Sequence, residues 1–149
     1  MYSFVRGGRV VGLDVGERRI GMAVSDPTRT LARPLGVLNV RGLGVSAIEQ
    51  AVTAVEVLRH EEDGVSRVVV GLPRRLDGTD NDLTPKVRLF SQALGLRTGL
   101  PITLQDERLT SREAESRLAV RERDWRVRKA RLDAAAAAII LQDYLDETS

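Results

Sequence analysis

Short apolar runs separated by polar links predict that the chain begins with three β-strands. The runs Val10–Leu13 and Ile20–Val24 flank the polar link Gly16–Arg19, a pattern that predicts a β-hairpin. A third strand is predicted over Leu31–Val40. Pro34 within it indicates an edge position, because proline cannot donate a ladder hydrogen bond.

The middle of the chain alternates between helical and strand patterns. Apolar residues at three- and four-residue steps from Ile48 to Leu58 predict an amphipathic helix, with Ser46 as its cap. The run Val68–Leu72 is typical of a strand buried on both faces of a parallel sheet. Thr84-Pro85 predicts the start of a second helix, with threonine as the cap and proline in the first turn.

The last part of the chain predicts one more strand and two helices. The strand is Pro101–Leu104, and it runs directly into Asp106-Glu107. Thr110 and Glu113 form a capping box for a helix through about Val120, and a final helix is predicted over Leu132–Leu145. The predicted order is therefore β-β-β-α-β-α-β-α-α, a five-stranded mixed α/β sheet with helices on both faces.

Composition is that of a globular protein, with 42% hydrophobic and 30% charged residues in 149. We expect one domain over residues 1–149, with residues 1–8 as a frayed lead-in. Cysteine is absent, which excludes disulfides and thiolate metal sites. No apolar run reaches the roughly 20 residues of a membrane span and no signal peptide is recognised, so we expect a cytoplasmic protein without a membrane partner.

Polar residues follow the predicted parallel strands at one edge of the sheet. If the crossovers are right-handed, the carboxyl ends of the first, fourth and fifth strands open on the same edge. Asp14, Pro73-Arg74 and Asp106-Glu107 fall there, where ligands of open α/β sheets bind. Asp14 lies between apolar neighbours, so its carboxylate requires a hydrogen bond, an ion pair or a metal unless it only caps the turn.

Three acids are candidate metal ligands: Asp14, Glu107 and Asp133, the last at the start of the final predicted helix. Converging carboxylates repel one another, and one or two Mg²⁺ or Mn²⁺ ions would relieve that repulsion and bind phosphodiester oxygens. Each acid has a simpler interpretation: Asp133 as a helix-dipole acid, Glu107 as a solvated loop residue. Asp106 competes with Glu107, because only one of two adjacent residues leaving a strand faces the site.

Four segments of the chain resemble the YqgF/RuvX family of the ribonuclease H-like superfamily. They read GLDVGERRIGMAVSD, VVVGLPRRLDGT, DERLTSREAE and LDAAAAAIILQDYL, and they extend from the first strand to the last helix. The resemblance implies a ribonuclease H-like fold, with Asp14, Glu107 and Asp133 as catalytic and metal-binding acids. It also implies an endonuclease that processes the 5′ end of 16S rRNA precursor or cuts Holliday junctions. Arg74-Arg75 depart from the smaller or apolar residues expected in that loop.

Arginine dominates the basic residues, since lysine occurs only at positions 86 and 129. Arginine suits phosphate recognition, and net charge is only +2, so the distribution of the basic residues matters more than their sum. The candidate nucleic-acid-binding residues are Arg18, Arg19, Arg74, Arg75, Arg108, Arg121, Arg123, Arg126, Arg128, Lys129 and Arg131. Trp125 either stacks on a base or anchors this segment to the core, and His60 is expected at the surface.

Two other classes of protein have related features. Actin-like and sugar-kinase ATPases open with a similar hairpin, but they need two such domains around a nucleotide, so we expect no nucleotide cofactor. A nucleic-acid-binding protein that does not cut is the second alternative, although all three acids are present. The expected partners are structured RNA or branched DNA, and the sequence is compatible with a monomer or a homodimer.

Overall fold

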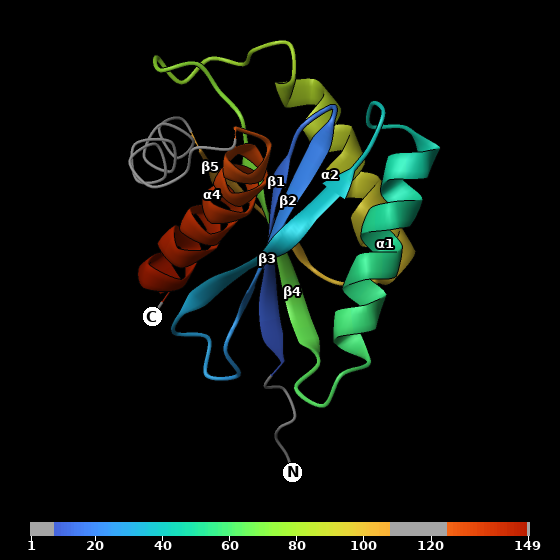
Figure 1. Ribbon diagram of the computed structural model, residues 1–149, viewed down its shortest axis with the longest axis vertical. Helices are drawn as coiled ribbons and strands as arrows, with labels where there is room; N and C mark the ends of the chain where they lie inside the picture. Colours follow the sequence, from blue (N-terminus) through green and yellow to red (C-terminus); the bar gives the residue numbers. More distant parts are fainter. Residues whose placement is uncertain (1–7, 108–124, 149) are drawn as a thin grey trace.

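The computed structural model describes residues 8–107 and 125–148, without side chains between 125 and 132. Its elements follow the chain from blue to red in Figure 1. The strands are β1 (Arg9–Val15), β2 (Arg19–Ser25), β3 (Ala32–Asn39), β4 (Val65–Leu72) and β5 (Ile102–Asp106). The helices are α1 (Val45–Arg59), α2 (Thr84–Thr98) and α4 (Trp125–Thr148).

The strands form one mixed sheet in the order β3-β2-β1-β4-β5. β1, β2 and β3 pair antiparallel, whereas β1, β4 and β5 run parallel. The hairpin turn closes through the Gly16 amide, which donates to the Arg19 carbonyl at 2.9 Å. The predicted mixed sheet is confirmed, and β3, which contains Pro34, is an edge strand as expected.

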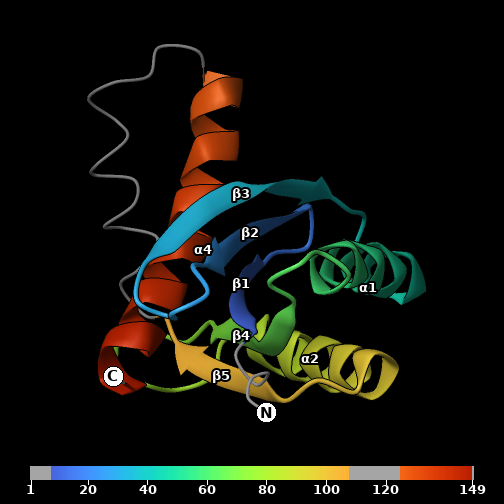
Figure 2. The same ribbon diagram turned by 90° about the horizontal axis from the view of Figure 1, so that it is seen from below.

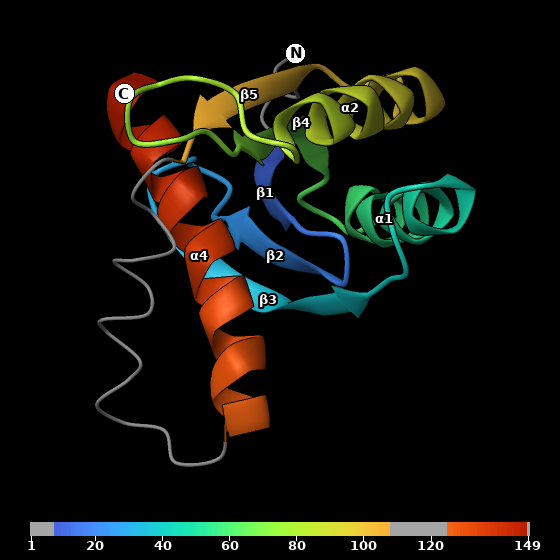
Figure 3. The same ribbon diagram turned by 90° about the horizontal axis from the view of Figure 1, so that it is seen from above.

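Helices cover both faces of the sheet: α1 and α2 lie on one face and α4 on the other (Figures 2 and 3). Side chains alternate along each strand, so Val11, Leu13 and Val15 face α1 and α2, whereas Val10 faces α4. Asp14 has the same parity as Val10, and therefore its side chain is on the α4 face. The fold thus directs the candidate acid toward the last helix.

Two strand glycines let α4 and its neighbours approach the sheet closely. A Cβ added to Gly21 would lie 2.1 Å from the backbone oxygen of Asp133, and one added to Gly71 would lie 2.5 Å from Ile140 Cδ1 and 3.2 Å from the Glu107 carboxyl. Real Cβ atoms do not make contacts below 3.0 Å. Glycine is therefore required at position 21, where a Cβ would meet helix backbone, whereas at position 71 a Cβ would have to displace the end of the Ile140 side chain.

The structure corrects three predicted helix starts. Gly44, not Ser46, is the N-cap of α1, and no side chain caps that helix. Leu83 is the N-cap of α2, and the hydroxyl of Thr84 instead donates to the Pro73 carbonyl at 2.6 Å in the buried interior.

The last helix begins at Trp125 rather than at the predicted Leu132, because the preceding basic segment is itself helical. Asp133 consequently lies two turns into α4, where the helix dipole no longer explains an acid. The helix predicted from Thr110 to Val120 lies outside the described residues. None of the described helices is long and apolar enough to cross a membrane.

Candidate active site

Asp14 lies near the carboxyl end of the central strand β1, directly opposite Gly21 of β2. Its strand neighbours Leu13 and Val15 are buried in the core on the other face. Gly21 has no side chain, so the backbone of α4 at Asp133 packs directly over the position opposite Asp14. The sheet thus presents this acid at the edge predicted from the sequence.

Glu107 follows β5 immediately and lies next to Asp14. Its amide donates to the Leu72 carbonyl at 3.3 Å, which continues the parallel pairing of β4 and β5 past Asp106. The Glu107 and Asp14 carboxyl groups hydrogen-bond to each other. Asp106 is exposed, so of the two adjacent acids only Glu107 faces the site, as predicted.

Burial of the two carboxyl groups makes both of them weaker acids. It raises the pKa of Asp14 to about 6, an effect that the hydrogen bond with Glu107 opposes and the charge of Asp133 reinforces. Burial, followed by the charge of Asp14, raises the pKa of Glu107 to about 9. At neutral pH and without a cation the pair therefore holds one proton, since two adjacent buried carboxylates cannot both ionise readily.

The third acid is not part of this close pair. Asp133 Oδ2 accepts a hydrogen bond of 2.8 Å from Arg19 Nε and forms a salt bridge with it. The charge of Asp133 still raises the pKa of Asp14, so the two carboxylates are neighbours. Within residues 8–107 and 133–148, however, no three acidic or histidine side chains converge closely enough to hold one ion between them.

The donor set fits a hard divalent cation. Glu107 Oε2 is buried and has no hydrogen-bond partner, a costly arrangement that a cation beside Asp14 would relieve. The donors are carboxylate oxygens, which Mg²⁺ and Mn²⁺ prefer, and no described sulfur or imidazole joins them. Asp14 and Glu107 thus offer a two-acid site, and the Asp133 carboxylate lies beside it in an ion pair with Arg19.

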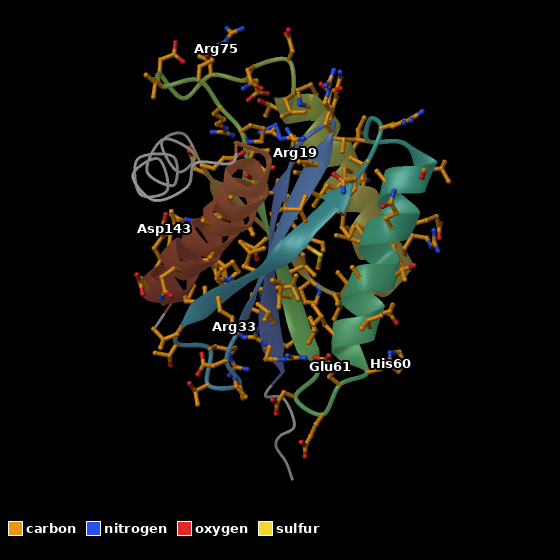
Figure 4. The ribbon with its side chains drawn as sticks, viewed as in Figure 1. Arg19, Arg33, His60, Glu61, Arg75 and Asp143 are labelled. Carbon is orange, nitrogen blue, oxygen red and sulfur yellow. The ribbon has the colours of Figure 1, made fainter. Side chains whose placement is uncertain are left out.

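The candidate arginines that the structure describes lie at the same end of the molecule as the acids. Arg19 and Arg75 are both at this end in Figure 4, whereas His60 and Glu61 lie at the far end of α1. Arg18 and Arg75 are exposed. Arg74 is 3.8 Å from Asp80, and its Nε is buried without a hydrogen-bond partner.

The remaining basic candidates lie outside the residues whose side chains the structure describes. Arg108, Arg121 and Arg123 lie outside the described residues. The backbone of α4 carries Trp125, Arg126, Arg128, Lys129 and Arg131. The first turns of α4 extend past edge strand β3 (Figure 3), so this basic segment projects from the body of the protein beside the site. His60 is exposed, as predicted.

Sequence reasoning missed two parts of this site. The bond between Arg19 and Asp133 joins residues that are 114 positions apart, and no local pattern indicates it. The positions of Gly21 and Gly71 were visible as glycines inside apolar strands, a signal that indicates close approach of another segment. Interpreted that way, they would have indicated that another segment packs closely against β2 and β4.

The mixed sheet, its strand order and the acids at its carboxyl edge define a ribonuclease H-like protein. A structure of RuvC from Thermus thermophilus in complex with a Holliday junction substrate superposes with a TM-score of 0.57, at 20% identity, over 95% of this chain and 97% of that chain. At this identity the likeness concerns the fold.

A family model and relatives that are more similar in sequence show the family of the chain. The chain belongs to the RuvX family, described as Holliday junction resolvase, whose model matches residues 8–147. A relative from Anaeromyxobacter sp. (strain Fw109-5) is 42% identical over 93% of this chain and 96% of its own length. One from Chloroflexus aurantiacus (strain ATCC 29366 / DSM 635 / J-10-fl) is 43% identical over 92% of this chain and 86% of its own. Both are named "Putative pre-16S rRNA nuclease".

Proposed function

We propose that this protein is a divalent-metal-dependent endonuclease that hydrolyses phosphodiester bonds in structured nucleic acid. The observation that carries the proposal is the buried Asp14–Glu107 pair, whose Glu107 Oε2 has no hydrogen-bond partner among the described residues. The pair lies at the carboxyl edge of a ribonuclease H-like sheet, in a chain of the RuvX family.

Three acids would hold one or two Mg²⁺ or Mn²⁺ ions: Asp14 and Glu107 as the primary pair and Asp133 as the third ligand. Bound there, the ions would supply Lewis-acid stabilisation of a phosphodiester and a more acidic water. Glu107 must give up its proton for this, and a neighbouring cation favours that ionised form. Gly21 and Gly71 leave room for the Asp133 backbone and the Glu107 carboxyl, and thereby keep the acids together.

The basic residues around the acids would bind the phosphate backbone. Arg18, Arg74 and Arg75 come from the two loops at the site edge, and Arg19 is the first residue of β2. The segment from Arg126 to Arg131 lies on the projecting part of α4 and would follow a strand of nucleic acid away from the site. Contacts of this kind fix position without reading sequence, which suits recognition of a shape.

The substrate favoured by the relatives' names is the 16S rRNA precursor, trimmed at its 5′ end during ribosome biogenesis in the cytoplasm. A second candidate is the four-way DNA junction of recombination and repair. It is favoured by the description of the family model. Both substrates are branched or folded polyanions, and the same acids would serve either.

The experiment offers the purified protein two labelled probes, a 16S precursor 5′ leader and a four-way DNA junction, each with Mg²⁺ or Mn²⁺. Wild-type protein is expected to cut at least one of them. Asp14→Asn keeps the shape of the side chain but removes its charge, so it should reduce cleavage at least about a hundredfold. Its matched control is Asp63→Asn, the same chemical change at an exposed position beyond α1. Cleavage by Asp14→Asn at the rate of Asp63→Asn would refute the assignment.

A further inference from the structure

Arg19 occupies a position from which it can reach both the acids and a bound nucleic acid. It is the first residue of β2 and lies two residues before Gly21. The two residues therefore point to the same face of the sheet, the α4 face, where Gly21 is paired with Asp14. Arg19 thus lies diagonally across from Asp14, at the rim of the candidate metal site.

Among the residues that the structure describes, only one nitrogen of the Arg19 guanidinium has a hydrogen-bond partner. Nε donates to Asp133 Oδ2 at 2.8 Å. In the part of the chain that the structure describes, neither Nη nitrogen has a hydrogen-bond acceptor. Since Nε, Nη1 and Nη2 lie in one rigid plane, fixing Nε on a helix also fixes the direction of the two remaining donors.

The accessibility of the pair fits a role toward a ligand better than a role in stability. The side chains of Arg19 and Asp133 are 30% and 22% exposed, so water reaches the ion pair and its contribution to stability is small. The adjacent Arg18 lies in the hairpin turn and is exposed, and its carbonyl accepts a hydrogen bond from the Val40 amide. The chain therefore holds one of two neighbouring arginines firmly and leaves the other in solvent.

We propose that Asp133 orients Arg19, and that the two Nη groups of Arg19 bind the phosphate that undergoes hydrolysis. The assignment rests on the proposed nuclease function and adds a specific interaction to it. Two parallel N–H donors match two phosphate oxygens, a geometry that lysine cannot reproduce.

The test is a double-mutant cycle between Arg19 and one phosphate. The cleaved phosphate is first mapped with wild-type protein and Mn²⁺ on whichever probe it cuts, the precursor leader or the four-way junction. That probe is then made with a neutral methylphosphonate at the mapped position, with a 2′-deoxy sugar beside it in RNA. A third version carries the methylphosphonate several nucleotides away. Binding is measured with Ca²⁺ in place of Mg²⁺, for wild type, Arg19→Gln, Arg19→Lys and the matched control Arg18→Gln.

Neutralising the cleaved phosphate should weaken wild-type binding about tenfold more than neutralising the distant one. Arg18→Gln should show the same tenfold difference between the two modified probes, because it removes a positive charge but no contact with the cleaved phosphate. In Arg19→Gln the difference between the two modified probes should fall below about threefold, since this variant has already lost the contact between residue 19 and the cleaved phosphate. Arg19→Lys keeps the positive charge but lacks the parallel N–H donors, so its difference between the two probes should lie between these values. This variant also tests the proposal if Arg19→Gln does not fold.

An equal factor in wild type and Arg19→Gln would overturn the assignment and leave Arg19 with a structural role, since loss of structure weakens all probes alike. If the wild-type protein cuts a probe but the effect of the methylphosphonate does not depend on Arg19, only the role of Arg19 at the phosphate is refuted. Failure of the wild-type protein to cut either probe refutes the proposed function, and the role of Arg19 with it.

Discussion

Replacing Gly21 by alanine should separate α4 from the sheet and thereby dismantle the site without touching any acid. The new Cβ would lie 2.1 Å from the Asp133 carbonyl oxygen and 2.6 Å from its carbonyl carbon. Both atoms belong to helix backbone, which cannot rotate aside as a side chain can. Because Cβ contacts below 3.0 Å do not occur, the helix must move by roughly 1 Å or more.

We expect Gly21→Ala to lower the free energy of unfolding by about 1–3 kcal/mol, which is the usual cost of overpacking a well-packed interior. For a protein of this length each kcal/mol lowers the melting temperature by roughly 2–4 °C, so Gly21→Ala should melt about 2–12 °C below wild type. The displaced segment carries Asp133, and activity should therefore fall much further than stability, since an error of about 1 Å at a catalytic group can reduce the rate a hundredfold.

Gly36→Ala is the matched control, because Gly36 is also a strand glycine and a Cβ there meets nothing within 4 Å. It should melt at or slightly above the wild-type temperature, since alanine restricts the unfolded chain more than glycine does. Thermal melts followed by circular dichroism, together with cleavage assays on the folded variants, compare the two. If Gly21→Ala melts within about 1 °C of Gly36→Ala and keeps its activity, the close approach of α4 does not hold the site together.

Three further outcomes are expected. In EDTA, the folded Asp14–Glu107 pair binds protons more tightly than the unfolded chain, with pKa values raised to about 6 and about 9. Stability from this pair is complete below about pH 4 and is lost as pH rises through both values, so urea midpoints should fall between about pH 4 and pH 9. Glu107→Gln should abolish the part of that fall between about pH 6 and pH 9, because Asp14 contributes only below it. With Mg²⁺, Glu107→Gln should be inactive while Asp106→Asn keeps substantial activity, because Asp106 is exposed; the reverse result would exchange their roles. Replacing Arg126 and Arg128 by alanine should flatten the slope of log affinity against log salt by about 0.7–0.9 for each phosphate that the variant no longer neutralises, and an unchanged slope would remove α4 from the nucleic-acid interface.

The part of the site on the parallel strands could be predicted because hydrophobic pattern and chain order determine it. An apolar run that ends in a polar residue indicates a strand end, and right-handed crossovers bring such ends together. Asp14 and Glu107 meet for this reason, at the edge that the sequence indicates. Both lie within one residue of the end of a strand, so an error in the strand bounds would not have moved them far.

The place of Asp133 could not be predicted in the same way, because it depends on where α4 starts and how closely the helix lies on the sheet. The basic residues before it concealed seven further helical positions, 125–131, since charged residues indicate neither a helix nor its end. Which of Arg18 and Arg19 lies on the α4 face beside the acids depends on strand register, because a shift of one residue would move the other arginine to that face. Register is set here by the pairing of Asp14 with Gly21, a long-range result of folding.

The glycines of the α4 face link the stability of the fold to the geometry of the site. Glycine in a strand is less stable than alanine by roughly 0.5–1 kcal/mol, so Gly21 and Gly71 weaken the sheet locally. In return, α4 lies close enough for Asp133 to influence Asp14, and the Glu107 carboxyl fits beside β4. The helix is anchored at its other end by Leu141 and Leu145, which are buried against Val10 and Val69. The apolar end of α4 therefore determines the position of the helix, and the glycines determine how near Asp133 comes to the sheet. In this way the charge of an acid on the last element of the chain raises the pKa of Asp14 on the first.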